Sequence, residues 1–194
     1  MSRTLRTLIL TVFVASCGGS ISDVKPPRNL NNACEILRER PDFKRAFERT
    51  ERRWGVPAYV QMSIIYHESK FVGDARTPLQ FALGVIPMGR LSSAYGYSQA
   101  LDGTWEEYLV ATGNRRAKRE DIRDASDFIG WYMNTTEAKL GISKRDARNQ
   151  YLAYHEGRAG YARGSHRAKA WLLAYADRVQ DLALVYEIQL RRCR

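Results

Sequence analysis

The segment Tyr59–Phe71, which reads YVQMSIIYHESKF, predicts a buried helix that carries one acidic side chain on its apolar face. Four of its residues follow one another at steps of four, four and three: Val60, Ile64, Glu68 and Phe71. This spacing turns the Glu68 carboxyl group toward the interior. Burial raises the pKa of a carboxyl group, which suits a general acid. Glu68 is therefore a candidate catalytic residue; the alternatives are a Glu at a frayed helix end that points to solvent, or one in a structural pair.

Helix signals continue along the chain, and strand signals are few. Apolar periodicity with Pro and Gly punctuation predicts helices over residues 41–53, 57–70, 105–112, 119–140, 143–157 and 167–190. Thr104 and Glu107 form a capping box before the third of these, and Gly113 ends it. The pattern predicts an all-α domain.

Two later motifs extend the pattern around Glu68. Residues 96–99 read GYSQ, with Thr104 downstream, and residues 153–157 read AYHEG. Together with ESKF at 68–71, they resemble in order and spacing the signature of the family 1 lytic transglycosylases, in the goose-type lysozyme-like superfamily. The resemblance runs from about Trp54 to about Val179 and implies a helical lysozyme-like fold. The chain has GYSQ and AYH where the family usually has Gly-Leu-Met-Gln and Ala-Tyr-Asn.

The resemblance also implies roles for individual residues. Glu68 would act first as acid and then as base in cleaving the bond between N-acetylmuramic acid (MurNAc) and N-acetylglucosamine (GlcNAc), a MurNAc-β-1,4-GlcNAc linkage. The MurNAc 6-hydroxyl would attack the anomeric carbon and leave a 1,6-anhydro end, with no cofactor. Ser69 would lie near the N-acetyl group, and Gln99 and Tyr154 would line the site, with Tyr154 hydrogen-bonded to Glu68. Most glycosidases use two carboxylates; Glu156 is the only nearby candidate, and its position is not catalytic in the family.

Residues 72–95 are the exception to the helical pattern. They combine Pro and Gly punctuation with apolar residues and show no sustained period, which predicts a long irregular loop. Loops of this length in compact domains are usually functional. We expect this loop to form a wall of the substrate groove, where Phe81, Tyr95 and Tyr97 offer rings for sugar stacking, although most aromatic residues simply belong to the core.

The N-terminus predicts export and lipid anchoring. Two arginines precede the apolar run Leu8–Ala15, which is too short to span a bilayer by itself. The run leads into VASC at 14–17, which resembles a bacterial lipobox. We expect residues 1–16 to be a lipoprotein signal peptide and Cys17 to carry the lipid that anchors the chain in a membrane. Gly18 favours the outer membrane, facing the periplasm; the alternative is a simple secretory peptide with an incidental Cys.

After this signal the sequence predicts a flexible tether, residues 17–32, and one catalytic domain, residues 33–194. Because lipidation uses Cys17, the other cysteines of the chain are Cys34 and Cys193, near the two ends of the domain. An exported protein meets an oxidising compartment, so we expect them to form a disulfide. The alternative is a pair of unrelated thiols.

Composition excludes some classes of function. Of 194 residues, 44% are hydrophobic and 11% aromatic, which suffices for a core without a structural metal. The formal net charge is +10, but Lys and Arg alternate with Asp and Glu, and no nucleic-acid module is present. We therefore expect no nucleic-acid partner; the carboxylate-bearing glycan strands of peptidoglycan and an anionic membrane surface are the expected counterparts.

Three alternatives to the transglycosylase remain open. The dipeptides His67-Glu68 and His155-Glu156 suggest a metal site, but HExxH is absent because residue 71 is Phe; no metal is expected. A hydrolase of the goose-type lysozyme kind would need a positioned water and usually further acidic residues. A non-catalytic wall-binding lipoprotein would keep the fold, yet the intact Glu68-Ser69 pair argues against lost activity.

Overall fold

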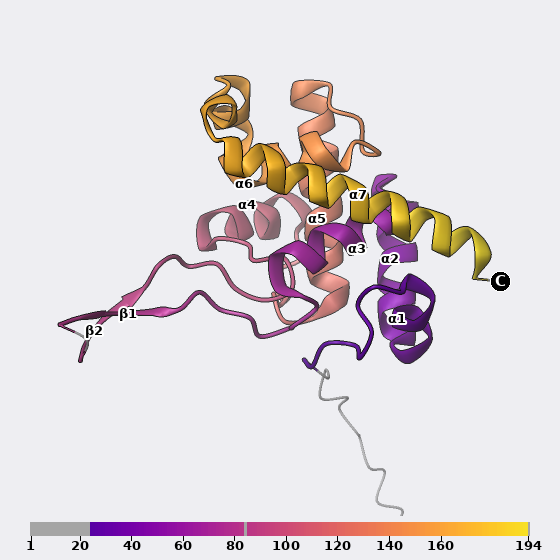
Figure 1. The fold of residues 1–194 in the computed structure, drawn as a ribbon, viewed down its shortest axis with the longest axis horizontal. Coiled ribbons are helices and arrows are strands. Elements are labelled where there is room, and N and C mark those ends of the chain that lie inside the picture. The colour runs from indigo at the N-terminus through magenta and orange to yellow at the C-terminus, as the bar shows by residue number, and fades with distance from the viewer. Residues whose placement is uncertain (1–23, 84, 194) are drawn as a thin grey trace, which may run out of the picture.

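Helices make up most of residues 24–83 and 85–193, which are the residues that this computed structural model describes (Figure 1). The helices are α1 Ala33–Glu39, α2 Pro41–Trp54, α3 Ala58–Ser69, α4 Asp102–Thr112, α5 Ile122–Leu140, α6 Ala147–Ala162, the 3₁₀ helix η1 Ser165–Ala168 and α7 Ala170–Arg192. The strands β1 Leu79–Ala82 and β2 Ile86–Arg90 form a two-stranded antiparallel sheet. The prediction of an all-α domain is confirmed. The predicted signal peptide and Cys17 lie outside the described residues.

Helix α5 lies in the core, with α2 packed closely along it. Gly130 allows this approach, because a Cβ atom there would lie 2.5 Å from a ring carbon of Trp54. The Asp127 carboxylate then joins three helices. It accepts hydrogen bonds from Arg53 and Trp54 of α2 and, at 2.8 Å, from the Tyr108 hydroxyl of α4. A buried carboxylate with three donors satisfies its hydrogen-bonding capacity, which burial requires.

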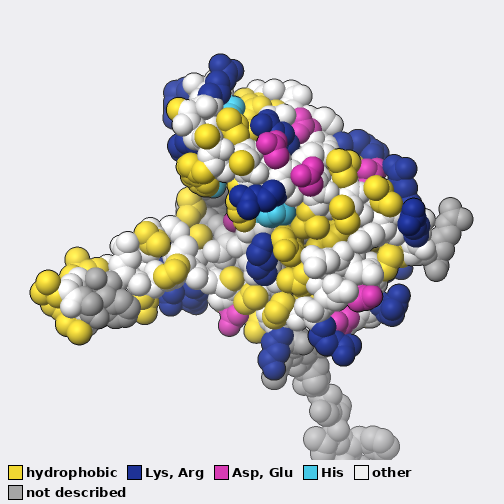
Figure 2. All heavy atoms as spheres, in the orientation of Figure 1, with side chains coloured by type: hydrophobic (Ala, Val, Ile, Leu, Met, Phe, Trp, Pro, Cys, Tyr) yellow, Lys and Arg dark blue, Asp and Glu magenta, His cyan; other side chains and the backbone are white. Residues whose placement is uncertain are grey.

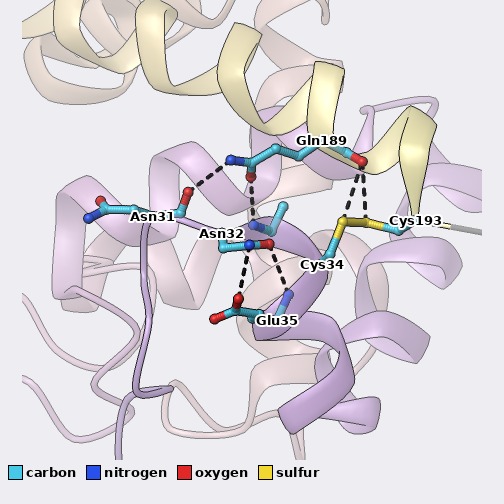
Figure 3. Close-up of a disulfide and its surroundings, with 7 residues drawn as sticks. Asn31, Asn32, Cys34, Glu35, Gln189 and Cys193 are labelled. Atoms are coloured by element: carbon cyan, nitrogen blue, oxygen red, sulfur yellow. Dashed lines mark hydrogen bonds between the residues drawn. A yellow bond between two sulfur atoms is a disulfide. The ribbon is translucent and has the colours of Figure 1, made fainter.

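Helix α7 crosses over α3 and α6, and the predicted disulfide ties its end to α1 (Figure 3). Cys34 and Cys193 are bonded, with their Cα atoms 5.6 Å apart and 159 positions apart in the chain. The Gln189 side chain reinforces this joint, because it donates to the Asn31 carbonyl at 3.0 Å and accepts from the Ala33 amide at 2.7 Å. The two ends of the described chain are thus held together covalently and by hydrogen bonds.

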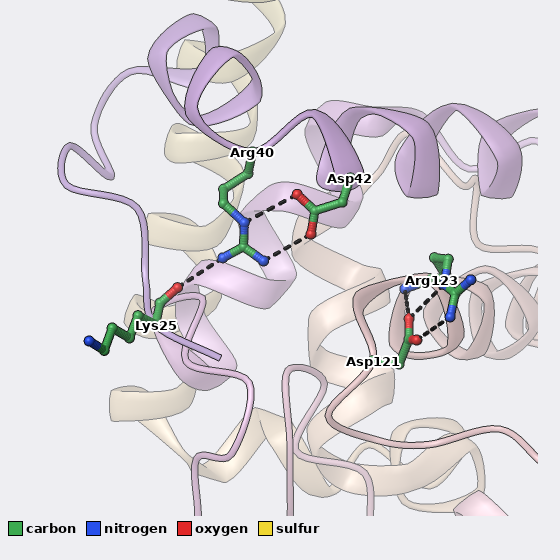
Figure 4. A network of polar contacts seen from close by, with 5 residues as sticks. All are labelled: Lys25, Arg40, Asp42, Asp121 and Arg123. Carbon is green, nitrogen blue, oxygen red and sulfur yellow. Dashed lines mark hydrogen bonds and ion pairs between the residues drawn. The ribbon is translucent and has the colours of Figure 1, made fainter. Parts of the chain in front are cut away.

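Residues 24–32 pack against the domain, although the sequence predicts them as part of a flexible tether. The Gly73 amide donates to the Val24 carbonyl at 2.8 Å. Arg40 donates to the Lys25 carbonyl at 3.0 Å while two of its other nitrogens bind Asp42 (Figure 4). These partners are distant in sequence, so local composition did not reveal them. The same close-up shows a separate pair, Asp121 and Arg123, at the start of α5.

Several helix ends differ from the sequence prediction. Helix α4 begins at Asp102 without a side-chain cap, so the capping box of Thr104 and Glu107 is wrong. Helix α6 begins after Asp146, whose side chain accepts from the Asn149 amide, rather than at Ser143.

Helix α6 also continues past the glycine predicted to end it. Gly157 has φ 70° and ψ 153°, which kinks the helix, and the helix then runs to Ala162. The Ser165 hydroxyl beyond the kink bonds the Gly160 carbonyl at 2.9 Å and the Glu156 carboxylate. Contacts with η1 therefore hold the second half in place.

The segment predicted as an irregular loop contains the hairpin, which extends away from the helices (Figure 1). Its strands have four and five residues, and Pro87 lies within β2. A Pro inside an apolar run argues against a strand, which explains why the sequence did not predict one. Tyr97, expected near sugar, belongs to the core: it is 1% exposed and its ring meets Phe43 edge-on at 5.6 Å.

No helix among residues 24–83 and 85–193 has the length and apolar character needed to cross a membrane.

Candidate active site

Glu68 lies in the last turn of α3 because the chain turns sharply after it. Lys70 and Phe71 both have left-handed backbone conformations, with φ 54° and 61°. The turn sends the Phe71 side chain into the core, where it stacks on Phe43 at 5.8 Å. Glu68 stays at the helix end and is half-buried. The predicted apolar face is confirmed for Val60, Ile64 and Phe71, and the carboxyl group lies at its edge.

The Glu68 carboxyl group has no charged or hydrogen-bonding partner among the described residues. Three tyrosines surround it closely enough for its charge to raise their pKa values: Tyr151, Tyr154 and Tyr175. Burial raises the pKa of Glu68 itself to about 8. The negative end of the α3 dipole acts in the same direction. Glu68 is therefore protonated at neutral pH and has a proton available to give.

This raised pKa makes a prediction for stability. An unfolded Glu ionises near pH 4.5, whereas folded Glu68 ionises near 8. Between these values the folded state binds a proton that the unfolded state has lost, so stability falls as pH rises through this window. Glu68→Gln cannot ionise and is expected to have a higher melting temperature than the parent at about pH 9 and the same one at about pH 4. Thermal unfolding across pH measures this, and a difference independent of pH would contradict it.

Tyr154 connects α6 to the GYSQ motif. Its hydroxyl donates to the Ser98 carbonyl at 2.6 Å, and its ring meets Tyr132 at 4.9 Å. The expected hydrogen bond from Tyr154 to Glu68 is not found, because the hydroxyl is used by Ser98. Burial, followed by the nearby Glu68 charge, raises the pKa of Tyr154 well above its usual value, so it stays a neutral donor. Tyr154 thus positions the motif beside Glu68.

The GYSQ motif is a tight turn that requires glycine at its first position. Gly96 has φ 79°, and a Cβ atom there would lie 2.2 Å from the Arg119 carbonyl oxygen. Gln99 follows with φ 48°. Its side-chain amide nitrogen donates to the carbonyls of Ala75 and Gly96, each at 2.9 Å. These bonds fix the Gln99 side chain and leave its amide oxygen available to a ligand.

Ser69 is the predicted site residue that the structure turns inward. Its hydroxyl donates to the Ile65 carbonyl, one turn earlier in α3, at 3.2 Å, and the residue is 7% exposed. The structure therefore brings Glu68 and Tyr154 together with the loop of Gln99, and it places the Ser69 hydroxyl against its own helix.

A row of aromatic side chains lies beside Glu68, and the sequence did not predict it. The centroid of the Tyr151 ring lies 5.5 Å from that of Tyr175 and 6.4 Å from that of His155. The His155 ring in turn packs edge-on against Trp171, with the ring centroids 5.4 Å apart. Trp171 is 60% exposed. The row is formed by two crossing helices, α6 and α7, each of which contributes a pair of residues four positions apart. That i,i+4 spacing was the available signal, but it also suits a buried core face.

Glu156 is held as a charged group and cannot serve as a second acid. Its carboxylate accepts from Lys169 at 2.7 Å, from the Ser165 hydroxyl, and contacts His155 at 3.1 Å. The Lys169 bond, then the Ser165 bond, lowers the pKa of Glu156 to about 2. The other histidine of the suggested metal site, His67, directs its ring nitrogen to the Ser63 carbonyl at 2.8 Å. No three potential metal ligands cluster within residues 24–83 and 85–193.

A family model described as "Transglycosylase SLT domain" matches residues 5–193. No curated protein matches the chain.

Proposed function

The chain belongs to the transglycosylase SLT domain family, lytic transglycosylases of the lysozyme-like superfamily that degrade peptidoglycan, and from this premise we propose that it cleaves the MurNAc-β-1,4-GlcNAc bond and leaves 1,6-anhydro-MurNAc ends. The observation that carries the proposal is the Glu68 carboxyl group, half-buried among tyrosines, without a partner among the described residues and with its pKa raised to about 8. A carboxyl group in this state can give a proton and then, as a carboxylate, accept another.

The first step transfers the Glu68 proton to the glycosidic oxygen as the bond to the MurNAc anomeric carbon breaks. Positive charge develops at that carbon, and the newly formed Glu68 carboxylate lies nearby to stabilise it. With no cation paired to Glu68 among the described residues, its charge is not neutralised by the protein. The carbon–oxygen electron pair leaves with GlcNAc, whose oxygen holds the transferred proton.

The second step supplies Glu68 with a new proton. The carboxylate accepts the proton of the MurNAc 6-hydroxyl while that oxygen forms a bond to the anomeric carbon. Glu68 ends as it began, no water is consumed, and the new sugar end is a 1,6-anhydro ring. Tyr154 supports the proposal as a neutral group beside Glu68, since its pKa responds to the Glu68 charge. Gln99 supports it as an amide held in a fixed orientation by the Ala75 and Gly96 carbonyls, in the turn that Tyr154 contacts through Ser98.

The products distinguish this reaction from hydrolysis. Purified peptidoglycan treated with the protein should release muropeptides lighter by one water than the corresponding hydrolytic products, as measured by mass spectrometry. Reducing ends in their place would assign the protein to the lysozyme-type hydrolases. Hydrolysis would need a carboxylate that activates water. Glu156 is poorly suited to that role, because Lys169 and Ser165 bind its carboxylate and lower its pKa to about 2, which makes it a weak base.

The family acts on peptidoglycan, which places the chain in the cell envelope. We further propose that Cys17 carries a lipid that anchors the chain in the outer membrane. Cys17→Ser is expected to leave an uncleaved or mislocalised precursor, because lipidation precedes cleavage at a lipobox. Membrane fractionation and the mass of the N-terminal peptide measure this. Unchanged fractionation together with an N-terminal peptide lacking lipid mass in the parent would contradict the anchor.

A further inference from the structure

The hairpin and its flanks, residues 76–83 and 85–91, form a protruding arm whose end carries exposed aliphatic side chains (Figure 2). Leu83 is 91% exposed and Val85 76% exposed, and other apolar residues along the arm are also exposed: Leu79, Ile86, Met88 and Leu91. Soluble domains seldom keep this many apolar groups together in water, so such a surface indicates a partner.

The charged side chains of the arm are all positive. The sequence contains no Asp or Glu from residue 75 to residue 101, and the arm carries Arg76 and Arg90. Figure 2 shows dark blue side chains between the apolar end of the arm and the body. Arg76 lies over the Tyr95 ring at 4.3 Å, and Arg90 donates to the Thr77 carbonyl at 2.6 Å. Neither forms an ion pair with a described residue. The arm therefore ends in aliphatic groups and has uncompensated cations at its base.

The backbone of the arm is poorly suited to receive a strand from another protein. Pro87 has no N–H to donate from β2, and the register shifts between Gln80 and Phe81, which interrupts the ladder. Continuous edges with regular donors and acceptors support strand addition. What the arm presents is side chains: aliphatic groups at the end, then arginines.

We propose that this arm inserts its apolar end into a lipid surface that contains anionic headgroups. Aliphatic side chains enter the boundary between headgroups and acyl chains, and arginines behind them contact headgroup phosphates and carboxylates. Only the end enters, since a two-stranded hairpin has unpaired backbone groups along its edges that hydrocarbon would not satisfy. This second membrane contact does not depend on the lipid proposed for Cys17, nor on catalysis.

Fluorescence of a probe at the end of the arm tests the proposal. Full-length protein with Val85→Cys, labelled with an environment-sensitive thiol dye, is mixed with vesicles of neutral lipid alone or with added anionic lipid. The control is Leu184→Cys, an apolar position on α7 that is also exposed to solvent, at 46% against 76% for Val85. Any dye attached to Cys17 is present in both variants, so the difference between their fluorescence signals comes from the dye at position 85 or 184. We expect a blue shift and quenching by nitroxide lipids for Val85→Cys only, stronger with anionic lipid.

Substitution of the arginines tests the role of charge. Arg76→Gln and Arg90→Gln are each expected to weaken the anionic-vesicle response about fivefold and to leave the neutral-vesicle response unchanged. Arg90→Lys keeps the charge and should respond like the parent, which separates charge from the hydrogen bond to Thr77. Equal signals from positions 85 and 184 would overturn the proposal. A blue shift that grows with protein concentration in the absence of vesicles would also overturn it, because it indicates that the arm binds a second copy of the protein. A blue shift produced only by glycan strands would overturn it as well.

Discussion

Glu68→Gln is expected to lower peptidoglycan turnover by about 10²–10⁴-fold, because the amide keeps the shape of the side chain but cannot give or recover a proton. The fold should persist, since no described residue depends on the carboxyl group for a hydrogen bond or ion pair. Release of 1,6-anhydro muropeptides, followed by mass spectrometry at matched protein concentrations, measures the rate. Cosedimentation with insoluble peptidoglycan should be unchanged, because binding does not need the proton.

Two further variants sharpen this result. Glu106→Gln makes the same chemical change at an exposed position of α4 and should keep full activity. Tyr154→Phe removes the hydrogen bond to Ser98 and should cost less than Glu68→Gln, because Tyr154 positions the motif rather than transferring the proton. If Glu68→Gln kept near-parental turnover, Glu68 would not be the proton donor, and its raised pKa would be a structural property alone.

Replacing both Cys34 and Cys193 by Ala is expected to lower the free energy of unfolding by about 5 kcal/mol. The bond closes a loop of 159 positions, and loss of loop-closure entropy in the unfolded chain grows with loop length. For a domain of this size the melting temperature should fall by roughly 10–20 °C. Chemical denaturation of the parent and the double variant measures the difference. Reductant should destabilise the parent to the level of the variant and leave the variant unaffected.

Equal midpoints for parent and double variant would instead assign the stability of this joint to its hydrogen bonds. Gln189 and Tyr186 already bind the backbone just before α1 and at its first residue, through Leu30, Asn31 and Ala33. Adding Gln189→Ala to the variant without the two cysteines would then measure the contribution of the hydrogen bonds, because this change removes two of them.

The sequence predicted those features that depend on local spacing. The apolar face of α3 and the ends of α2 and α3 follow from periodicity and from Pro41 and Pro57. The Cys34–Cys193 bond followed from the predicted export of the chain. The features that the sequence did not predict depend on contacts between residues far apart in the chain. Residues 24–32 pack because of Gly73 and Arg40, and α6 continues past Gly157 because η1 supports its second half.

The candidate site shows the same division. The sequence identified Glu68 as a candidate catalytic residue because it is an acidic side chain on the apolar face of its own helix. The orientation of Tyr154 toward Ser98 depends on how α6 packs against the GYSQ turn. The row formed by Tyr151, Tyr175, His155 and Trp171 depends on how α6 crosses α7. A spacing of four residues predicts neither the crossing nor which helix face lies beside Glu68.

The disulfide has one more consequence, for the fate of the protein after a cut by a protease. The exposed end of the arm, at Leu83 and Val85, offers a protease an accessible stretch of backbone. A cut there would divide the sequence into two fragments, one carrying Cys34 and Glu68, the other Cys193 and Tyr154. The covalent bond would keep the fragments in a single molecule, and the contacts of α3 with α7 and of α2 with α5 would keep them folded together. Glu68 and Tyr154 would remain side by side in an enzyme whose chain is no longer continuous.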